Sequence, residues 1–236
     1  MRRRRFLQIA LPALAMLLVR APASEAAPIL IGTLGESENC VPFGCPTTLV
    51  DSGTYQQVYS NSLFGEPGEV SSITFFDTFD AFLPDFDALA SGAYTFSFST
   101  TSAPVGGLST ILGNNAGSDS QVFFAGPLGG PLGGPSFTLS GTPFFYDPAL
   151  GNLLLQVNFA ASGGESFTFF DSNEENRLFS RAYSFAGGLA DSRGLVTQFD
   201  FQPIQPIPEP STLILIGSGL LGACARRWRT RSTTGR

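Results

Sequence analysis

Short segments in which large apolar residues alternate with small or polar ones recur along the chain, and they limit the fold more than any other feature. Residues 94–98 (YTFSF) and 195–201 (LVTQFDF) show the pattern most clearly. A strand with one buried face requires this two-residue period. Between the two ends of the chain, no segment keeps a 3.6-residue apolar period for three turns. The 23 phenylalanines also favour pleated surfaces.

Gly, Pro, Asn, Asp and Ser separate these segments, which predicts an all-β domain, an antiparallel β-sandwich or jelly roll. A barrel is the alternative. Three stretches are expected to be loops: residues 113–119, the Gly-Pro-Leu-Gly repeat at 126–135, and a Pro-rich spacer at 203–207. The expected strands are 29–34, 54–59, 70–76, 93–99, 121–125, 136–140, 143–146, 153–160, 166–170, 181–185 and 195–201.

The N-terminus has the layout of a secretory signal peptide. Four arginines at 2–5 precede an apolar run at 6–19, and small residues follow. The run is too short to cross about 30 Å of hydrocarbon comfortably. Small residues before the cut predict that signal peptidase cleaves after Ala26 or Ala23, so residues 1–26 are read as the signal peptide. An uncleaved anchor is the alternative, and the arginines fit either general or twin-arginine export.

The C-terminus carries a second apolar run, residues 212–225, which an arginine cluster follows directly. At about 1.5 Å per residue, a helix over this run is only about 21 Å long and spans a bilayer only where the bilayer thins. The arginines hold this end in the cytoplasm and leave the preceding domain on the far side. A permanent anchor is the alternative to a removable signal.

Residues 208–231 resemble the PEP-CTERM sorting signal of Gram-negative bacteria that make exopolysaccharide. The resemblance implies processing by a membrane protease of the exosortase class, after transient residence in the inner membrane. The cell surface or the extracellular matrix is then the expected destination. By this resemblance, the recognition motif is Pro208, Glu209 and Pro210, the helix is 212–225, and the membrane stop is Arg226, Arg227 and Arg229.

The domain between the two signals, residues 28–202, is strongly acidic. Ten of the 13 arginines lie in the two ends, so three positive side chains between residues 28 and 206 face 17 negative ones, a formal net charge of −14. A domain this poor in basic residues is not expected to bind nucleic acid. Its charge is compatible with solubility, with cation binding, or with repulsion from anionic polymers.

The chain has no histidine and no lysine. Ser-His-Asp and Cys-His catalysis, histidine-ligated metals and Schiff-base chemistry are therefore excluded. Cys40 and Cys45 close a short loop in an exported protein, which favours a disulfide over a zinc site.

Two carboxylate-rich segments are candidate calcium sites, because hard cations take clustered carboxylate and carbonyl oxygens. The alternatives for the first segment are a solvated hairpin with outward aspartates, or a glycosidase pair. The second lacks the glycine and the final glutamate of an EF-hand loop, so a polar turn is its alternative. The candidate ligands are Asp77, Asp80, Asp85 and Asp87 in the first segment, and Asp171, Asn173 and Glu175 in the second.

Tyr55, Tyr59 and Tyr146 could stack on sugar rings if their side chains are exposed. The leading hypothesis is a non-enzymatic protein of the cell surface or biofilm matrix that binds exopolysaccharide or serves structurally. A secreted carboxylate-dependent glycan hydrolase and a calcium-stabilised adhesion module are the alternatives. No cofactor is expected apart from calcium.

Overall fold

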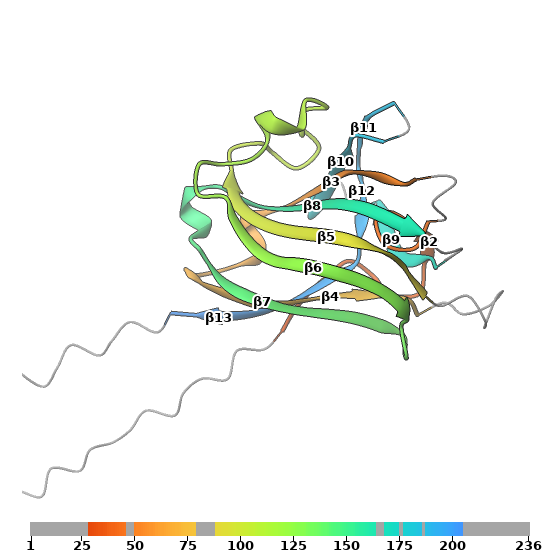
Figure 1. The fold of residues 1–236 in the computed structure, drawn as a ribbon. Coiled ribbons are helices and arrows are strands. Elements are labelled where there is room, and N and C mark those ends of the chain that lie inside the picture. The colour runs from red at the N-terminus through yellow and green to blue at the C-terminus, as the bar shows by residue number, and fades with distance from the viewer. Residues whose placement is uncertain are drawn as a thin grey trace, which may run out of the picture.

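The computed structural model describes residues 28–45, 50–78, 88–163, 168–174, 177–185 and 187–204. These residues form antiparallel strands and three single-turn 3-10 helices, which confirms the predicted all-β class (Figure 1). The predicted signal peptide and the helix at 212–225 lie outside the described residues. The strands are β1 (Ile29–Ile31), β2 (Ser37–Asn39), β3 (Ser52–Tyr59), β4 (Gly68–Phe76), β5 (Ala88–Thr101), β6 (Gln121–Pro131), β7 (Ser136–Tyr146), β8 (Asn152–Gly163), β9 (Phe170–Glu174), β10 (Phe179–Tyr183), β11 (Leu189–Asp191), β12 (Arg193–Leu195) and β13 (Thr197–Pro203).

The strands make three sheets. One has four strands in the order β1-β13-β4-β7, and a larger one has six in the order β11-β10-β3-β8-β5-β6. A small third sheet, β12-β9-β2, joins segments from both ends of the domain. The last long strand, β13, pairs with β1 and with β4, so the two ends of the domain are held together in one sheet.

The core lies between the four-stranded and six-stranded sheets and is built from aromatic rings. Phe98 of β5 approaches Phe144 of β7 and Phe199 of β13, with ring centroids 5.9 and 6.1 Å apart. Alternate residues of β5, Tyr94, Phe96 and Phe98, point into this core, as the sequence pattern predicts. Burying an aromatic side chain of this size contributes about 1.5–3 kcal/mol to stability.

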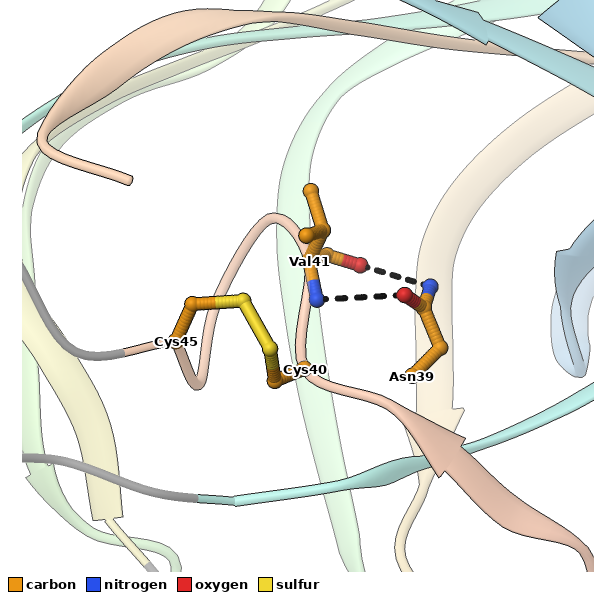
Figure 2. The surroundings of a disulfide bond; sticks show 4 residues. All are labelled: Asn39, Cys40, Val41 and Cys45. Atoms are coloured by element: carbon orange, nitrogen blue, oxygen red, sulfur yellow. Dashed lines mark hydrogen bonds between the residues drawn. A yellow bond between two sulfur atoms is a disulfide. The ribbon is translucent and has the colours of Figure 1, made fainter. Parts of the chain in front are cut away.

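Cys40 and Cys45 are joined by a disulfide (Figure 2). The loop that they close carries Phe43 into the core, where its ring lies 4.8 Å from Phe75 and 5.7 Å from Phe96. Hydrogen bonds hold the loop on both sides, because Ala90 N–H donates to the Phe43 carbonyl and Thr168 N–H to the Gly44 carbonyl. A Cβ at position 44 would lie 2.2 Å from the Thr168 carbonyl oxygen, which explains the glycine there.

The Gly-Pro-Leu-Gly repeat was expected to be a loop, and this prediction is wrong, because β6 continues through it to Pro131. The repeat has an even period, so Pro127 and Pro131 direct their backbone nitrogens to the same side of the strand. β6 is the last strand of its sheet and pairs only with β5. Prolines within sheets are confined largely to edge strands, and the position of β6 at the edge of its sheet agrees with this.

Other strand boundaries also differ from the prediction. The expected pair 136–140 and 143–146 is one strand, β7, which has a register shift against β4. The expected polar turn at 171–176 is replaced by β9, which pairs with β12 and β2 through its polar residues. Further differences are that the first strand ends at Ile31, that 195–201 is divided at Val196, that β13 extends to Pro203, and that β2 and β11 were not expected.

The segment 102–120 lies on the outer side of the six-stranded sheet (Figure 1). Its Leu108 joins Val58, Leu154 and Ala182 in a small apolar cluster. Gly106 N–H donates to the Ser180 hydroxyl at 2.7 Å and fixes the segment to β10. The segment 102–120 therefore covers one part of the outer face and leaves the part farther along β3, β8 and β5 uncovered.

Candidate functional site

The two carboxylate-rich segments meet in space, although they are far apart in the sequence. Thr78, which follows Asp77, donates its hydroxyl to Asp171 Oδ2 at 2.6 Å. Asp171 is wholly buried and also accepts the Gly35 N–H at 3.0 Å. Asp77 is nearly buried, and its own N–H donates to the Pro135 carbonyl at 2.9 Å. Asp171 therefore ties β9 to the end of β4 and to the turn after β1.

Asn173 has a similar role two residues along β9. Its Oδ1 accepts the Thr33 N–H at 2.5 Å, and its Nδ2 donates to Glu36 Oε2 at 3.1 Å. Among the described residues, no three His, Cys, Asp or Glu side chains gather as a metal site would require. The remaining candidate ligands, Asp80, Asp85, Asp87 and Glu175, lie outside the described residues. Asp171 and Asn173 act in this structure as acceptors for backbone and hydroxyl donors.

The tyrosines considered for sugar stacking are not exposed. Tyr55, Tyr59 and Tyr146 are wholly buried, so that hypothesis is wrong for all three. Each hydroxyl has a partner inside the protein: Tyr59 bonds to Thr197 Oγ1 at 2.9 Å, and Tyr146 donates to the Gly151 carbonyl at 2.7 Å. Burial raises the pKa of all three hydroxyls and keeps them neutral.

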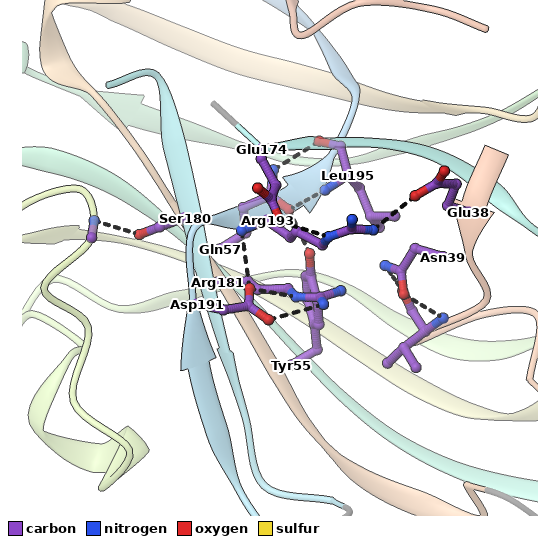
Figure 3. A network of polar contacts seen from close by, with 12 residues as sticks. Glu38, Asn39, Tyr55, Gln57, Glu174, Ser180, Arg181, Asp191, Arg193 and Leu195 are labelled. Carbon is purple, nitrogen blue, oxygen red and sulfur yellow. Dashed lines mark hydrogen bonds and ion pairs between the residues drawn. The ribbon is translucent and has the colours of Figure 1, made fainter. Parts of the chain in front are cut away.

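A buried polar network joins the six-stranded sheet to β12 of the small sheet (Figure 3). The Gln57 side chain acts on Leu195 as a neighbouring strand would. Its Nε2 donates to the Leu195 carbonyl at 2.8 Å, and its Oε1 accepts the Leu195 N–H at 2.8 Å. Tyr55 donates to the same Oε1 at 2.5 Å. One glutamine therefore satisfies the buried Leu195 N–H, and it shares the Leu195 carbonyl with the Thr197 hydroxyl, which donates to it at 3.0 Å.

Two of the three arginines between the signals are used in structural ion pairs. Arg181 makes a two-pronged contact with Asp191, at 2.9 and 3.1 Å, across β10 and β11. Burial lowers the pKa of Arg181, but the hydrogen bond to Asp191 and the charge interactions with Tyr55, Asp191 and Tyr183 together outweigh burial, so the net pKa is raised. Arg193 bridges Glu38 at 2.9 Å and Glu174 at 3.1 Å, and so links all three strands of the small sheet. Both guanidinium groups thus serve to hold strands together.

Beside the segment 102–120, the outer face consists of three rungs, each a row of paired residues across β3, β8 and β5; the first two are uncovered, and in the third Gln56 and Ser97 are buried and only Gln156 is partly exposed. The rungs carry no charged side chain. The oxygens of two amides are fixed by β3, because Asn158 Oδ1 accepts the Thr54 hydroxyl and Gln156 Oε1 accepts Gln56 Nε2, each at 2.7 Å. Exposure decreases from the first rung to the third. The rungs are Ser52-Ala160-Ala93, Thr54-Asn158-Thr95 and Gln56-Gln156-Ser97.

The segment 102–120 borders this face at the third rung. Gln56 Nε2 donates to the Leu112 carbonyl at 3.1 Å, and Asn115 Nδ2 donates to Gln56 Oε1 at 2.7 Å. The face is thus open at Ser52 and closed by this segment at the other end. The amides escaped the sequence analysis, which sought charges and aromatic rings. The feature of the sequence that could have indicated these amides is the polar residue at alternate positions in the strands predicted at 54–59 and 153–160.

A shallow hollow of about 640 Å³ lies where β5, β6 and β7 come together. Leu89, Ser91 and Phe137 line it together with residues 127–132 of the glycine-proline repeat. The lining has no carboxylate or other ionisable side chain. A carboxylate pair of the kind that glycan hydrolysis uses is not part of this hollow.

Comparison with known proteins gives one match, at the C-terminus. The protein family described as the PEP-CTERM protein-sorting motif matches residues 206–229, in agreement with the sequence analysis. Neither a curated protein nor a solved structure matches the chain. Within the described part of the chain, no helix has the length and apolar character needed to cross a membrane. The chain therefore carries the sorting motif of an exported protein, consistent with an exosortase substrate.

Proposed function

We propose that this protein is a non-enzymatic component of the cell surface or extracellular matrix, delivered there by exosortase processing. The observation that carries the proposal is the PEP-CTERM motif at residues 206–229, placed directly after an all-β domain. In this proposal the domain is a β-sandwich that associates with exopolysaccharide after release. The Cys40–Cys45 disulfide supports a destination outside the cytoplasm, where disulfides persist.

Delivery is tested by Glu209→Gln in the full chain. We expect the variant to remain in the inner membrane with its tail, while the parent chain is released. Glu66→Gln is the matched control, because Glu66 is exposed in the domain and far from the motif in sequence. The mass of the mature protein from each strain gives both cleavage positions. Release of the Glu209→Gln variant with the parent mass would contradict exosortase-type processing.

The role after release is tested by fractionating cells, matrix and medium. The proposal expects the mature protein in the polysaccharide-containing matrix fraction, and enzymatic digestion of the matrix polymer should free it. Recovery of the mature protein wholly in the medium, with none in the matrix, would contradict an association with exopolysaccharide.

A further inference from the structure

The open part of the outer sheet face offers hydrogen-bond donors in a fixed arrangement. The oxygens of Asn158 and Gln156 are held by Thr54 and Gln56 of β3, so the amide nitrogens point away from β3. Neither amide nitrogen donates to another group in the described part of the chain. A planar amide with its oxygen fixed has little rotational freedom to lose when a ligand accepts from its nitrogen.

The same face supplies hydroxyl groups beside the amides. On the adjacent strand β5, Thr95 pairs with Asn158 and is partly exposed, and on β3 Thr54 is partly exposed as well. Neighbouring strands lie about 4.8 Å apart, so donors and hydroxyls alternate over a short distance. A hydroxyl both donates and accepts, which matches the hydroxyl groups of a sugar. The small exposed side chains of Ala93 and Ala160 leave the first rung flat and accessible.

The charge of the domain and of this face determines which class of polymer can bind here. The three rungs carry no charge, although the domain around them has a formal net charge of −14. An anionic polymer would be repelled by the domain and would find no cation on this face. A neutral chain loses nothing by approaching the acidic domain and can use the amide and hydroxyl groups.

We propose that the face formed by Thr54, Asn158, Thr95 and Gln156, beside the exposed Ala93 and Ala160, binds a neutral, hydroxyl-rich polysaccharide chain. The inference rests on the proposed matrix role and assigns it a surface and a class of polymer. The polysaccharide lies against the open rungs, and its contact with the protein ends at the segment 102–120. Binding is by hydrogen bonds, because no aromatic residue stands on these rungs.

The test uses the mature protein purified from the exported fraction, and affinity electrophoresis in gels that each contain one polymer. Hydroxyethylcellulose and dextran are the neutral probes, and alginate is the anionic one. We expect a neutral polymer to retard the parent chain and alginate not to do so. The double variant Asn158→Asp, Gln156→Glu keeps the acceptor oxygens but loses both donors and gains charge, so its affinity should fall at least tenfold. Retardation by alginate alone, or by no polymer, overturns the proposal.

The control makes the same chemical changes on another sheet. Gln198→Glu with Gln202→Glu alters two β13 residues, and this variant should bind as the parent does. Ala93→Glu changes an exposed position on the first rung without touching a hydrogen bond, so it tests the face even if the amide variant misfolds. Undiminished binding by Ala93→Glu and the amide variant overturns the proposal. If those variants still reach the matrix fraction, the proposed function stands without this surface, whereas absence of the parent from the matrix refutes the proposed function itself.

Discussion

Neighbouring residues in the six-stranded sheet point to opposite faces, and the two faces have different chemistry. On the inner face Tyr55, Val157 and Phe96 form one row and are wholly buried. On the outer face the next row, Thr54, Asn158 and Thr95, is polar and half-exposed. Because both rows belong to the same strands, the side chains of two consecutive residues lie in different environments, one in the buried core and the other on the polar outer face. The inner rows hold the domain together, and the outer rows are free to meet a partner.

The comparison predicts that sensitivity to mutation alternates along β3, β8 and β5. Removing a buried aromatic ring costs about 3–5 kcal/mol, whereas surface substitutions usually change stability by less than about 0.5 kcal/mol. The largest loss of stability is expected at a position where many aromatic rings meet. Phe43 packs against Phe75, Phe96 and other rings of both sheets.

Phe43→Ala should lower the free energy of unfolding by about 3–5 kcal/mol, because it leaves a cavity among rings that cannot fully collapse. Urea unfolding followed by fluorescence or circular dichroism measures the change. Thr95→Ala on the outer face is the control and should change stability by about 0.5 kcal/mol or less. Equal losses for the two variants would show that the faces do not differ as the structure indicates.

The next test compares adjacent glutamines. Gln56 and Gln57 are both wholly buried, but Gln57 points inward and bonds to both backbone groups of Leu195. Gln57→Leu removes the acceptor of the Leu195 N–H and of the Tyr55 hydroxyl, and each unsatisfied buried group costs about 1–3 kcal/mol. We expect a loss of about 2–4 kcal/mol in urea unfolding. Gln56→Leu should cost less, because Leu112 and Gln156 are partly exposed and can reach water, and Asn115 Nδ2 still donates to the Ser109 carbonyl. The reverse order would contradict the assignment of the two faces.

The all-β class and most strands could be predicted from the sequence because the two-residue pattern is local. The exposure of the tyrosines could not, since it depends on which face each strand turns to the second sheet. Tyr55 and Tyr59 share the inward parity of their strand, and Tyr146 is buried at the end of β7. The contact between Thr78 and Asp171 was equally beyond prediction, because 93 residues separate them in sequence.

The buried tyrosines also predict how stability depends on pH. Burial raises the pKa of Tyr94 to about 12, above its ordinary value of 10.0. Above about pH 10 the unfolded chain loses protons that the folded chain keeps, so stability falls as pH rises toward the folded pKa. At pH 12, Tyr94 alone should reduce the free energy of unfolding by roughly 2–3 kcal/mol.

Urea unfolding at pH 8 to 12, with tyrosinate absorbance recorded in parallel, measures this dependence. Tyr94→Phe removes a hydroxyl that donates to the Ala90 carbonyl at 2.9 Å, so it should lower stability at pH 8 but flatten the alkaline decline. An unfolding free energy that stays constant from pH 9 to 12 would contradict neutral, buried tyrosines.

The smallest effect on stability is expected at the edge of the same sheet. Pro127 and Pro131 lie in β6, the last strand of this sheet, and neither has a backbone N–H that could bond to a second chain extending the sheet. Pro127→Thr with Pro131→Thr restores two donors, and we expect less than about 1 kcal/mol change in unfolding free energy. We expect more association than in the parent chain, measured by light scattering against concentration. Pro104→Thr, in the exposed segment 102–120, adds a donor away from any strand edge and should not associate. If the double variant associates no more than Pro104→Thr, the prolines do not protect the edge, and the repeat serves only the shape of β6.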